Sequence, residues 1–302
     1  MLDGKPVCPA PLLLCFGPRL EGKVLPLLSQ PQNSAQVREI RPRLGQINFV
    51  NCLPVLLPLT SGHVEINADI TEDTPANLNS GYTSGELDLG AMSSFYYLSN
   101  EEDLVLLPGL SISTKAEVGS VLFFAKDQVA NGCRVVVPAS SATSVALLKL
   151  YLATVHSIKA EIFTNARPDL KDSSYDAALV IGDRALTVDG QWSENAERID
   201  LGQWWSTNFK VPMVFGVWAA RKTWRDGNFE TFEHLSAELR TARDLGLGPL
   251  FNDVLQQAEK RTALSRHRLE RYFLEELDYS LDDEHLAGLS LFKEQLIKHA
   301  IL

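Results

Sequence analysis

The chain has 302 residues, of which 45% are hydrophobic and 22% are charged, as in ordinary soluble globular proteins long enough for two domains. This composition excludes the disordered and fibrous classes. The formal net charge of -10 argues against nucleic acid or an acidic membrane surface as a partner, because both require a basic surface that releases counterions. A small anion can still bind locally.

The first forty residues are rich in proline and show no regular hydrophobic period. Their apolar run over 12–16 is shorter than the core of a signal peptide or a membrane span. Cys15 follows Leu14 instead of a small residue, which argues against a lipoprotein. We therefore expect a cytoplasmic protein with a loosely ordered extension over 1–40, and leave open whether that extension belongs to the native protein.

The four cysteines, Cys8, Cys15, Cys52 and Cys133, form no C-x-x-C pair and have no histidine at metal-ligand spacing. The sequence therefore predicts reduced, mostly buried thiols, with neither a zinc site nor a disulfide framework. We also expect no other metal and no cofactor. A basic run over 260–271 is interleaved with glutamates on a helical pattern. That pattern is typical of a solvated helix face.

From residue 44 the chain alternates short apolar runs with helical segments, a pattern typical of an α/β fold with largely parallel strands. The first part predicts strands at 45–50, 64–70, 87–92, 104–107, 110–114 and 118–125, with helices at 54–60 and 76–84. Thr74 and Pro75 open the second of these helices as an N-cap followed by proline. The next part predicts strands at 134–137, 160–163 and 176–181, with a helix at 141–156.

One more long strand is predicted at 211–221, and only helical patterns follow it, at 229–245, 250–264, 268–277 and 283–299. Helices alone cannot extend a sheet, so we expect this tail to pack on the first domain. The expected division is a discontinuous domain 1 over 41–125 and 213–302, and a domain 2 over 126–212. Two crossings between domains imply a hinged cleft, where ligand pockets are expected.

A serine-rich helix start is the most informative local feature. The strand at 134–137 leads into a helix whose first turn carries Ser140, Ser141, Ala142, Thr143 and Ser144. The first amides of a helix lack internal partners and lie at the positive end of its dipole, so they favour a carboxylate or phosphate. No glutamate stands at the capping-box position to compete with a ligand. An ordinary N-cap that faces solvent is the alternative interpretation.

Further polar residues follow the ends of predicted strands, where open α/β sheets bind ligands. They are Asn51, Ser93, Ser94, Ser120 and Asp183. Each has a plainer explanation: a turn residue, a helix cap, a satisfied strand hydroxyl, or a cap paired with Arg184. Taken together, these residues predict a polar site in the cleft.

Several segments in order resemble the chorismate dehydratase family of the futalosine route to menaquinone. These segments are 47–54, 85–90 with Ser93 and Ser94, 107–113, 118–122, 140–149, 178–186 and 214–219. They cover roughly 43–221, and the first and the serine-rich segment are the most specific. The N-terminal extension and the helical tail add little to the resemblance.

The resemblance implies a two-domain fold like the type II periplasmic solute-binding proteins, used as a cytoplasmic lyase. The implied reaction removes water from chorismate and gives 3-[(1-carboxyvinyl)oxy]benzoate. By motif position, Asn51 and Ser120 are implied to lie closest to the chemistry. The serines at 93, 94, 140, 141 and 144, together with Ala142, Thr143 and Asp183, are implied to bind the substrate. Because the ring becomes aromatic, positioning and exclusion of water can supply much of the rate.

The group that removes the C3 proton is open in the sequence. His63 and His156 are candidates, but both are predicted away from the cleft, and His156 suits a helix C-terminus. Our hypothesis is that the substrate's own enolpyruvyl carboxylate acts as the base. Two other functions also stay open: a solute-binding protein that performs no chemistry, and the sister lyase that acts on cyclic dehypoxanthinyl futalosine. Oligomeric state is not readable from the sequence.

Overall fold

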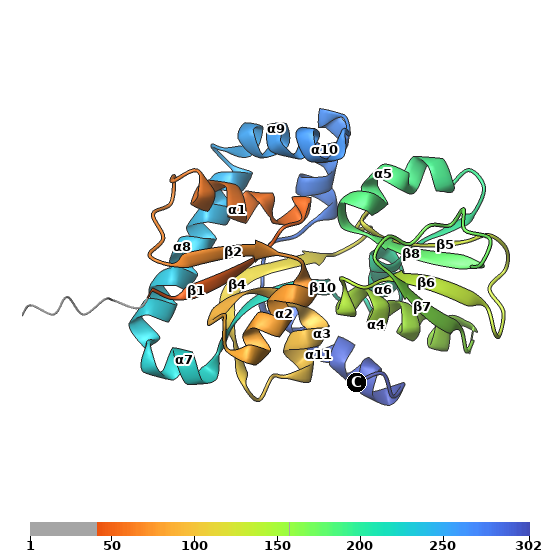
Figure 1. Ribbon diagram of the computed structural model, residues 1–302, viewed down its shortest axis with the longest axis horizontal. Helices are drawn as coiled ribbons and strands as arrows, with labels where there is room; N and C mark the ends of the chain where they lie inside the picture. Colours follow the sequence, from red (N-terminus) through yellow and green to blue (C-terminus); the bar gives the residue numbers. More distant parts are fainter. Residues whose placement is uncertain (1–40, 157) are drawn as a thin grey trace, which may run out of the picture. The chain divides into compact units, whose positions relative to one another are not determined.

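Two five-stranded sheets, each flanked by helices, form the framework of the chain (Figure 1). The computed structural model describes residues 41–302 except residue 157. The extension expected over 1–40 therefore lies outside the described residues. The two mixed sheets confirm the predicted α/β class.

The first sheet has the order β2-β1-β3-β10-β4. Strands β1 (Arg43–Ile47), β2 (Asp69–Asp73) and β3 (Leu89–Ser93) pair in parallel, whereas β10 (Met213–Arg221) runs antiparallel between β3 and β4 (Leu104–Thr114). Strand β4 was predicted as two strands. Gly109, at a φ of 75°, lies in a bulge where the register with β10 shifts, and pairing resumes beyond it.

The second sheet has the order β7-β6-β8-β5-β9. It consists of β5 (Val121–Ala125), β6 (Arg134–Pro138), β7 (Glu161–Asn165), β8 (Ala177–Ile181) and β9 (Glu197–Asp200). The short edge strand β9 was not predicted, because its sequence Glu-Arg-Ile-Asp carries a single apolar residue.

Strand β5 corrects the expected domain boundary. The sequence predicts it as the last strand of domain 1, but it pairs antiparallel with β8 and β9 in the second sheet. The first crossing between sheets therefore lies at 115–120, and the second lies just before β10. We propose a domain 1 of 41–114 with 213–302, and a domain 2 of 115–212.

Helices α1 (Leu53–Thr60), α2 (Pro75–Ser84) and α3 (Ser94–Ser99) belong to domain 1. Domain 2 contains α4 (Ala142–Tyr151), its π-helical extension η2 (Leu152–His156), α5 (Gly182–Trp192) and α6 (Leu201–Phe209). The side chain of His156 lies outside the described residues.

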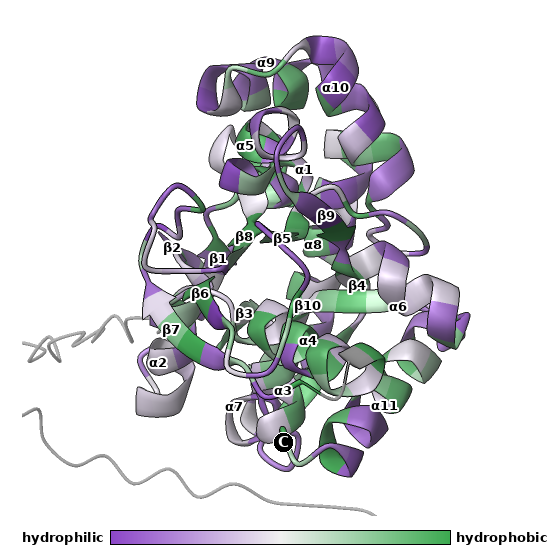
Figure 2. Ribbon diagram, turned by 90° about the vertical axis from the view of Figure 1, so that its right-hand side faces the viewer, coloured by the Kyte–Doolittle hydropathy of each residue, from purple (hydrophilic) through white to green (hydrophobic). Residues whose placement is uncertain are grey.

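The helical tail comprises α7 (Lys222–Gly227), α8 (Phe229–Leu247), α9 (Phe251–Thr262), α10 (Arg266–Arg271), the π turn η3 (Tyr272–Glu276) and α11 (Asp283–Lys298). It packs mainly on elements of the first sheet, with α8 against α1 and β4 and with α11 against β10. Helix α8 lies against α1 so closely that a Cβ on Gly246 would stand 2.0 Å from the carbonyl oxygen of Pro54. Figure 2 shows the hydrophobic residues along β10 and β4, whereas α10 is mostly hydrophilic.

Candidate active site

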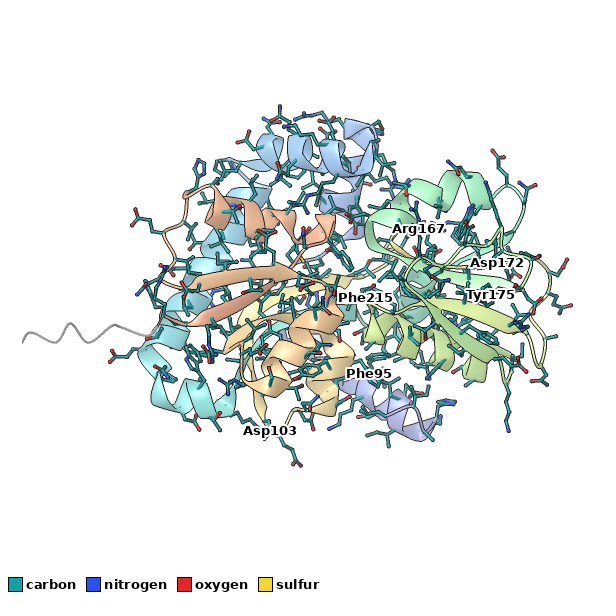
Figure 3. The ribbon with its side chains drawn as sticks, viewed as in Figure 1. Phe95, Asp103, Arg167, Asp172, Tyr175 and Phe215 are labelled. Atoms are coloured by element: carbon teal, nitrogen blue, oxygen red, sulfur yellow. The ribbon has the colours of Figure 1, made fainter. Side chains whose placement is uncertain are left out.

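A central cavity lies between the two domains, and side chains from both line it. Its polar lining consists of Asn51, Cys52, Ser93, Ser120, Ser141 and Ser144. Its apolar lining includes Ile47, Phe49, Ile112, Ile181, Phe215 and Leu277. Phe215 is labelled in Figure 3, where it lies between the two sheets. Five of the ten predicted site residues therefore meet at one place.

Asn51 lies in the short 3-10 turn η1 (Val50–Cys52) that follows β1 directly. The hydroxyl of Tyr279, in the tail, donates to its backbone carbonyl oxygen at 2.8 Å, which fixes the turn. The Oδ1 of Asn51 is buried and has no hydrogen-bond partner among the described residues. A buried acceptor of this kind, at a cavity wall, is suited to a ligand donor.

Ser120 ends the first crossing and is 3% exposed. Its hydroxyl oxygen accepts a hydrogen bond from the hydroxyl of Tyr272 at 2.9 Å, and its carbonyl oxygen accepts one from Gly182 N at 2.8 Å. The preceding Gly119 has a φ of 63°, and a Cβ there would stand 2.3 Å from Glu276 Oε2. Glycine is therefore required where the chain turns Ser120 into the cavity.

Ser93 and Ser94 differ in their roles. Ser93 lines the cavity and also caps α3, since its hydroxyl accepts from Tyr96 N at 3.3 Å. Ser94 is fully buried beside the cavity wall, and its Oγ has no partner within the described part of the chain. Ser93 is thus both a helix cap and a lining residue, whereas Ser94 is outside the lining.

The serine-rich helix start is both a cap and part of the cavity wall. Ser141 caps α4 by accepting from Ser144 N at 3.4 Å, and its hydroxyl donates to Ser144 Oγ at 2.9 Å. Both residues line the cavity. Ser140 and Ala142 instead line a neighbouring groove along α4.

Thr143 and Asp183 join the two domains instead of lining the cavity. Thr143 Oγ1 accepts from the backbone N–H of Phe95, on α3 of domain 1, at 3.0 Å. Asp183 Oδ1 accepts from the backbone N–H of Val50 at 2.9 Å, and burial raises the pKa of Asp183. The partner of Asp183 is therefore Val50, not Arg184 as one interpretation of the sequence suggested.

The cavity wall is electrically neutral. No Asp, Glu, His, Lys or Arg side chain lines it within residues 41–302 other than 157, and burial raises the pKa of Cys52, so that thiol stays protonated. His63, a candidate base, lies exposed beyond α1 and contacts Ser61 at 2.8 Å. An anion held here would be bound by hydroxyls, amides and the N-termini of α4 and α5.

A family model described as menaquinone biosynthesis matches residues 42–297. The chain belongs to this menaquinone biosynthesis family. Among curated relatives, it is 32% identical over 243 residues to the chorismate dehydratase of Thermus thermophilus. The aligned region covers 74% of this chain and 84% of that protein.

Solved structures that resemble this chain show the same fold. Protein AF1704 from Archaeoglobus fulgidus matches with a TM-score of 0.70 and 19% identity, over 86% of this chain and 98% of that one. The periplasmic aliphatic sulphonate binding protein SsuA from Escherichia coli matches with a TM-score of 0.60 and 16% identity, over 86% and 92%. The predicted periplasmic-binding-protein-like fold is thereby confirmed.

Several residues around the cavity of this family member were missed in the sequence. Phe49 and Phe215 lie inside segments that carried the family resemblance, but their aromatic side chains were not singled out. Tyr272 and Tyr279 stand in the helical tail, more than 150 positions from the residues they contact. No local pattern links them to the site.

The lengths and compositions of the described helices bear on whether the chain crosses a membrane. None of those within 41–302 combines the length and the apolar character that a bilayer crossing requires. Metal ligands were not expected, and no group of three or more His, Cys, Asp or Glu side chains gathers at metal-binding distance among the described residues.

Proposed function

We propose that this chain is a chorismate dehydratase, which removes water from chorismate to give 3-[(1-carboxyvinyl)oxy]benzoate in menaquinone biosynthesis. The observation that carries the proposal is the 32% identity to a chorismate dehydratase over most of the chain. The neutral cavity, with hydroxyl and amide groups on an apolar wall, supports it. We further propose that the protein works in the cytoplasm.

The reaction places modest demands on the site. The C3–H bond breaks, its electron pair forms the last ring double bond, and the C4–O bond breaks, so a proton and a hydroxide leave as water. Aromaticity of the product favours this elimination. The protein must hold a dianion in one orientation and keep water out of the cavity.

We assign roles to the lining residues from their geometry. The unpartnered Oδ1 of Asn51 is available to a substrate hydroxyl, and the hydroxyl hydrogen of Ser120 is available to a substrate oxygen. Ser141 and the first amides of α4 suit one carboxylate, and Ser93 suits the other. These roles need no charged side chain.

The base is assigned to the substrate itself. Because the lining holds no carboxylate, imidazole or amine among the described residues, the enolpyruvyl carboxylate of chorismate is the basic group at hand. The role of the protein is then to hold the substrate in the orientation in which this carboxylate reaches the C3 proton. This assignment would be overturned if one ionisable side chain proved essential for turnover and dispensable for binding.

The test incubates the purified protein with chorismate alone and measures the small molecules by mass spectrometry. We expect a product lighter than chorismate by one water. Asn51→Ala should abolish it, whereas Asn208→Ala, at an exposed position on α6, should leave it intact.

Unchanged chorismate from a folded protein would contradict the dehydratase. Cyclic dehypoxanthinyl futalosine would then be supplied in the same assay, and its conversion would identify the sister lyase. A rise in melting temperature with chorismate but no product would instead identify a solute-binding protein, the activity named for the sulphonate-binding neighbour.

A further inference from the structure

A hydrogen bond ties the first crossing to the tail at the cavity wall. The phenol of Tyr272, in η3, lies 2.9 Å from the hydroxyl of Ser120. Tyr272 is fully buried and Ser120 is 3% exposed. Ser120 lines the cavity, whereas Tyr272 is outside the lining. The Tyr272 hydroxyl therefore acts on a bound ligand through Ser120, the lining residue that it contacts.

The direction of this hydrogen bond decides what Ser120 can do. The Tyr272 hydroxyl donates, so the Ser120 oxygen accepts and its own hydrogen is left to point at an acceptor in the cavity. Burial raises the pKa of Tyr272, so the phenol keeps its proton and remains a donor. In a chain of hydroxyls, each bond polarises the next, which strengthens the second donor.

The π turn that carries Tyr272 is held in place by several contacts. Its own carbonyl oxygen accepts from Leu277 N at 3.1 Å, which closes the π turn. At the end of the same turn, Glu276 pairs with Arg268 at 3.0 Å and with Arg271 at 3.1 Å. The ring packs against Phe273 with centroids 5.5 Å apart. A buried ring on a turn held in this way gives its hydroxyl a defined position relative to Ser120.

We propose that Tyr272 is a positioning residue for the dehydration: it holds the Ser120 hydroxyl as a hydrogen-bond donor aimed at an oxygen of the substrate. The proposal rests on the function proposed above. It adds to the site a residue that never touches the substrate. It also gives the helical tail a part in the reaction.

The test is a double-mutant cycle with Tyr272→Phe, Ser120→Ala and the combined variant, measuring kcat, KM and melting temperature for each. We expect Tyr272→Phe to lower kcat about tenfold with little change in KM, as expected for the loss of one aligned hydrogen bond. In the Ser120→Ala background, the same substitution should change kcat by less than twofold, because the hydroxyl through which it acts is gone.

Tyr82→Phe is the matched control. Tyr82 is also a buried tyrosine, its hydroxyl donates to the carbonyl oxygen of Ala91 at 3.0 Å, and it is outside the cavity lining. We expect this variant to lower the melting temperature and leave kcat unchanged. If Ser120→Ala is too slow for steady-state rates, the same cycle is run on the single-turnover rate constant with enzyme in excess over chorismate.

The outcomes separate the two proposals. Equal effects of Tyr272→Phe in both backgrounds, or a loss of melting temperature alone, would overturn the positioning role while leaving the dehydratase intact. A wild-type protein without turnover would overturn the dehydratase and the positioning role together.

Discussion

At the scale of single residues, the site uses polar groups that carry no charge. Asn51 and Ser120 present an acceptor and a donor to the cavity, and each is tied to a different tyrosine of the tail. Ser141 and Ser144 add hydroxyls at the start of α4. A dianion bound by such groups gains directed hydrogen bonds without burying a cation.

An added negative charge at the start of α4 should weaken binding. Ser141→Glu places a carboxylate beside the first amides of the helix, where it competes with a substrate carboxylate for the same donors. We expect the dissociation constant of the product to rise at least about tenfold, the effect of roughly 1.4 kcal/mol. Calorimetry measures it.

Thr187→Glu, at an exposed position on α5, adds the same charge away from the cavity and serves as the control. Its affinity should match the wild type. If Ser141→Glu, with a normal melting temperature, also bound the product normally, the serine-rich turn would be only a helix cap.

The residue scale also shows how far sequence spacing alone can place a side chain. Asn51 and Ser93 were predicted because each directly follows an apolar strand of the first sheet, and Ser120 because it lies in the segment 118–122 that opens the next predicted strand. Asp183 met the same criterion, yet its carboxylate contacts Val50 across the cleft. Sequence spacing places a residue near an edge but does not set the direction of its side chain.

At the scale of elements, the π turn and the start of α11 anchor the tail to the first sheet. The backbone N–H and C=O of Ser113, in β4, both form hydrogen bonds with the backbone of Asp278. The two residues thereby form an isolated antiparallel bridge at the edge of the sheet. His285 is fully buried in the first turn of α11, with Nδ1 2.6 Å from Asp282 and Nε2 3.3 Å from Asp278. These contacts couple the helix to the sheet edge.

The His285 contacts predict a pH-dependent stability. Burial lowers the pKa of His285, but its hydrogen bonds to Asp278 and Asp282 outweigh this and raise it above the usual value. Because the pKa of His285 is higher in the folded than in the unfolded protein, protonated His285 stabilises the fold. This stabilisation is complete below the unfolded-state pKa of about 6.5 and is lost as the pH rises through the folded-state pKa. Because His285 lowers the pKa of Asp278, that carboxylate stays ionised throughout this range.

We therefore expect the melting temperature to fall as pH rises from about 6 toward 9. In His285→Gln, which cannot titrate, the fall should be clearly smaller. Calorimetric melts at matched ionic strength measure both slopes. Parallel curves for the two proteins would show that other groups set the pH dependence.

Element boundaries mark the limits of sequence prediction. The strands β1, β3, β6, β8 and β10 and the tail helices were predicted because their apolar periods are clear. Strand β9 was missed, and β4 was predicted as two strands separated near Gly109. Edge strands and bulges depend on the strands they pair with more than on local hydropathy. Partners that lie far along the chain leave no local trace.

At the scale of the whole molecule, polar bonds cross the cleft on both sides of the cavity. One joins Asp183 to Val50 N, and the other joins Thr143 to Phe95 N. At the first crossing, Glu117 pairs with Arg198 of β9 at 2.9 Å and with Arg271 of α10 at 3.0 Å. These contacts favour the closed arrangement of the two domains.

Removing a cross-cleft bond should weaken binding without touching the cavity wall. Asp183→Ala deletes the acceptor for Val50 N, so a smaller fraction of molecules is closed and the apparent dissociation constant rises in proportion. We expect a rise of about threefold to tenfold, as for loss of one net hydrogen bond. Solution scattering should show a larger radius of gyration without ligand.

Asp183→Asn retains a side-chain oxygen in the same place and is the matched control. It should bind the product nearly as tightly as the wild type. An unchanged affinity and radius in Asp183→Ala would mean that this bond does not govern closure.

The position of β10 has a consequence for how the protein is made. This strand lies inside the first sheet, between β3 and the edge strand β4, yet it is encoded more than 90 residues after β4 ends. Domain 2 has all of its strands once residue 200 leaves the ribosome, whereas β3 and β4 wait with unpaired edges until β10 emerges. Synthesis therefore completes the later sheet first, and the nascent β3 and β4 edges are where the unfinished chain is most exposed to aggregation.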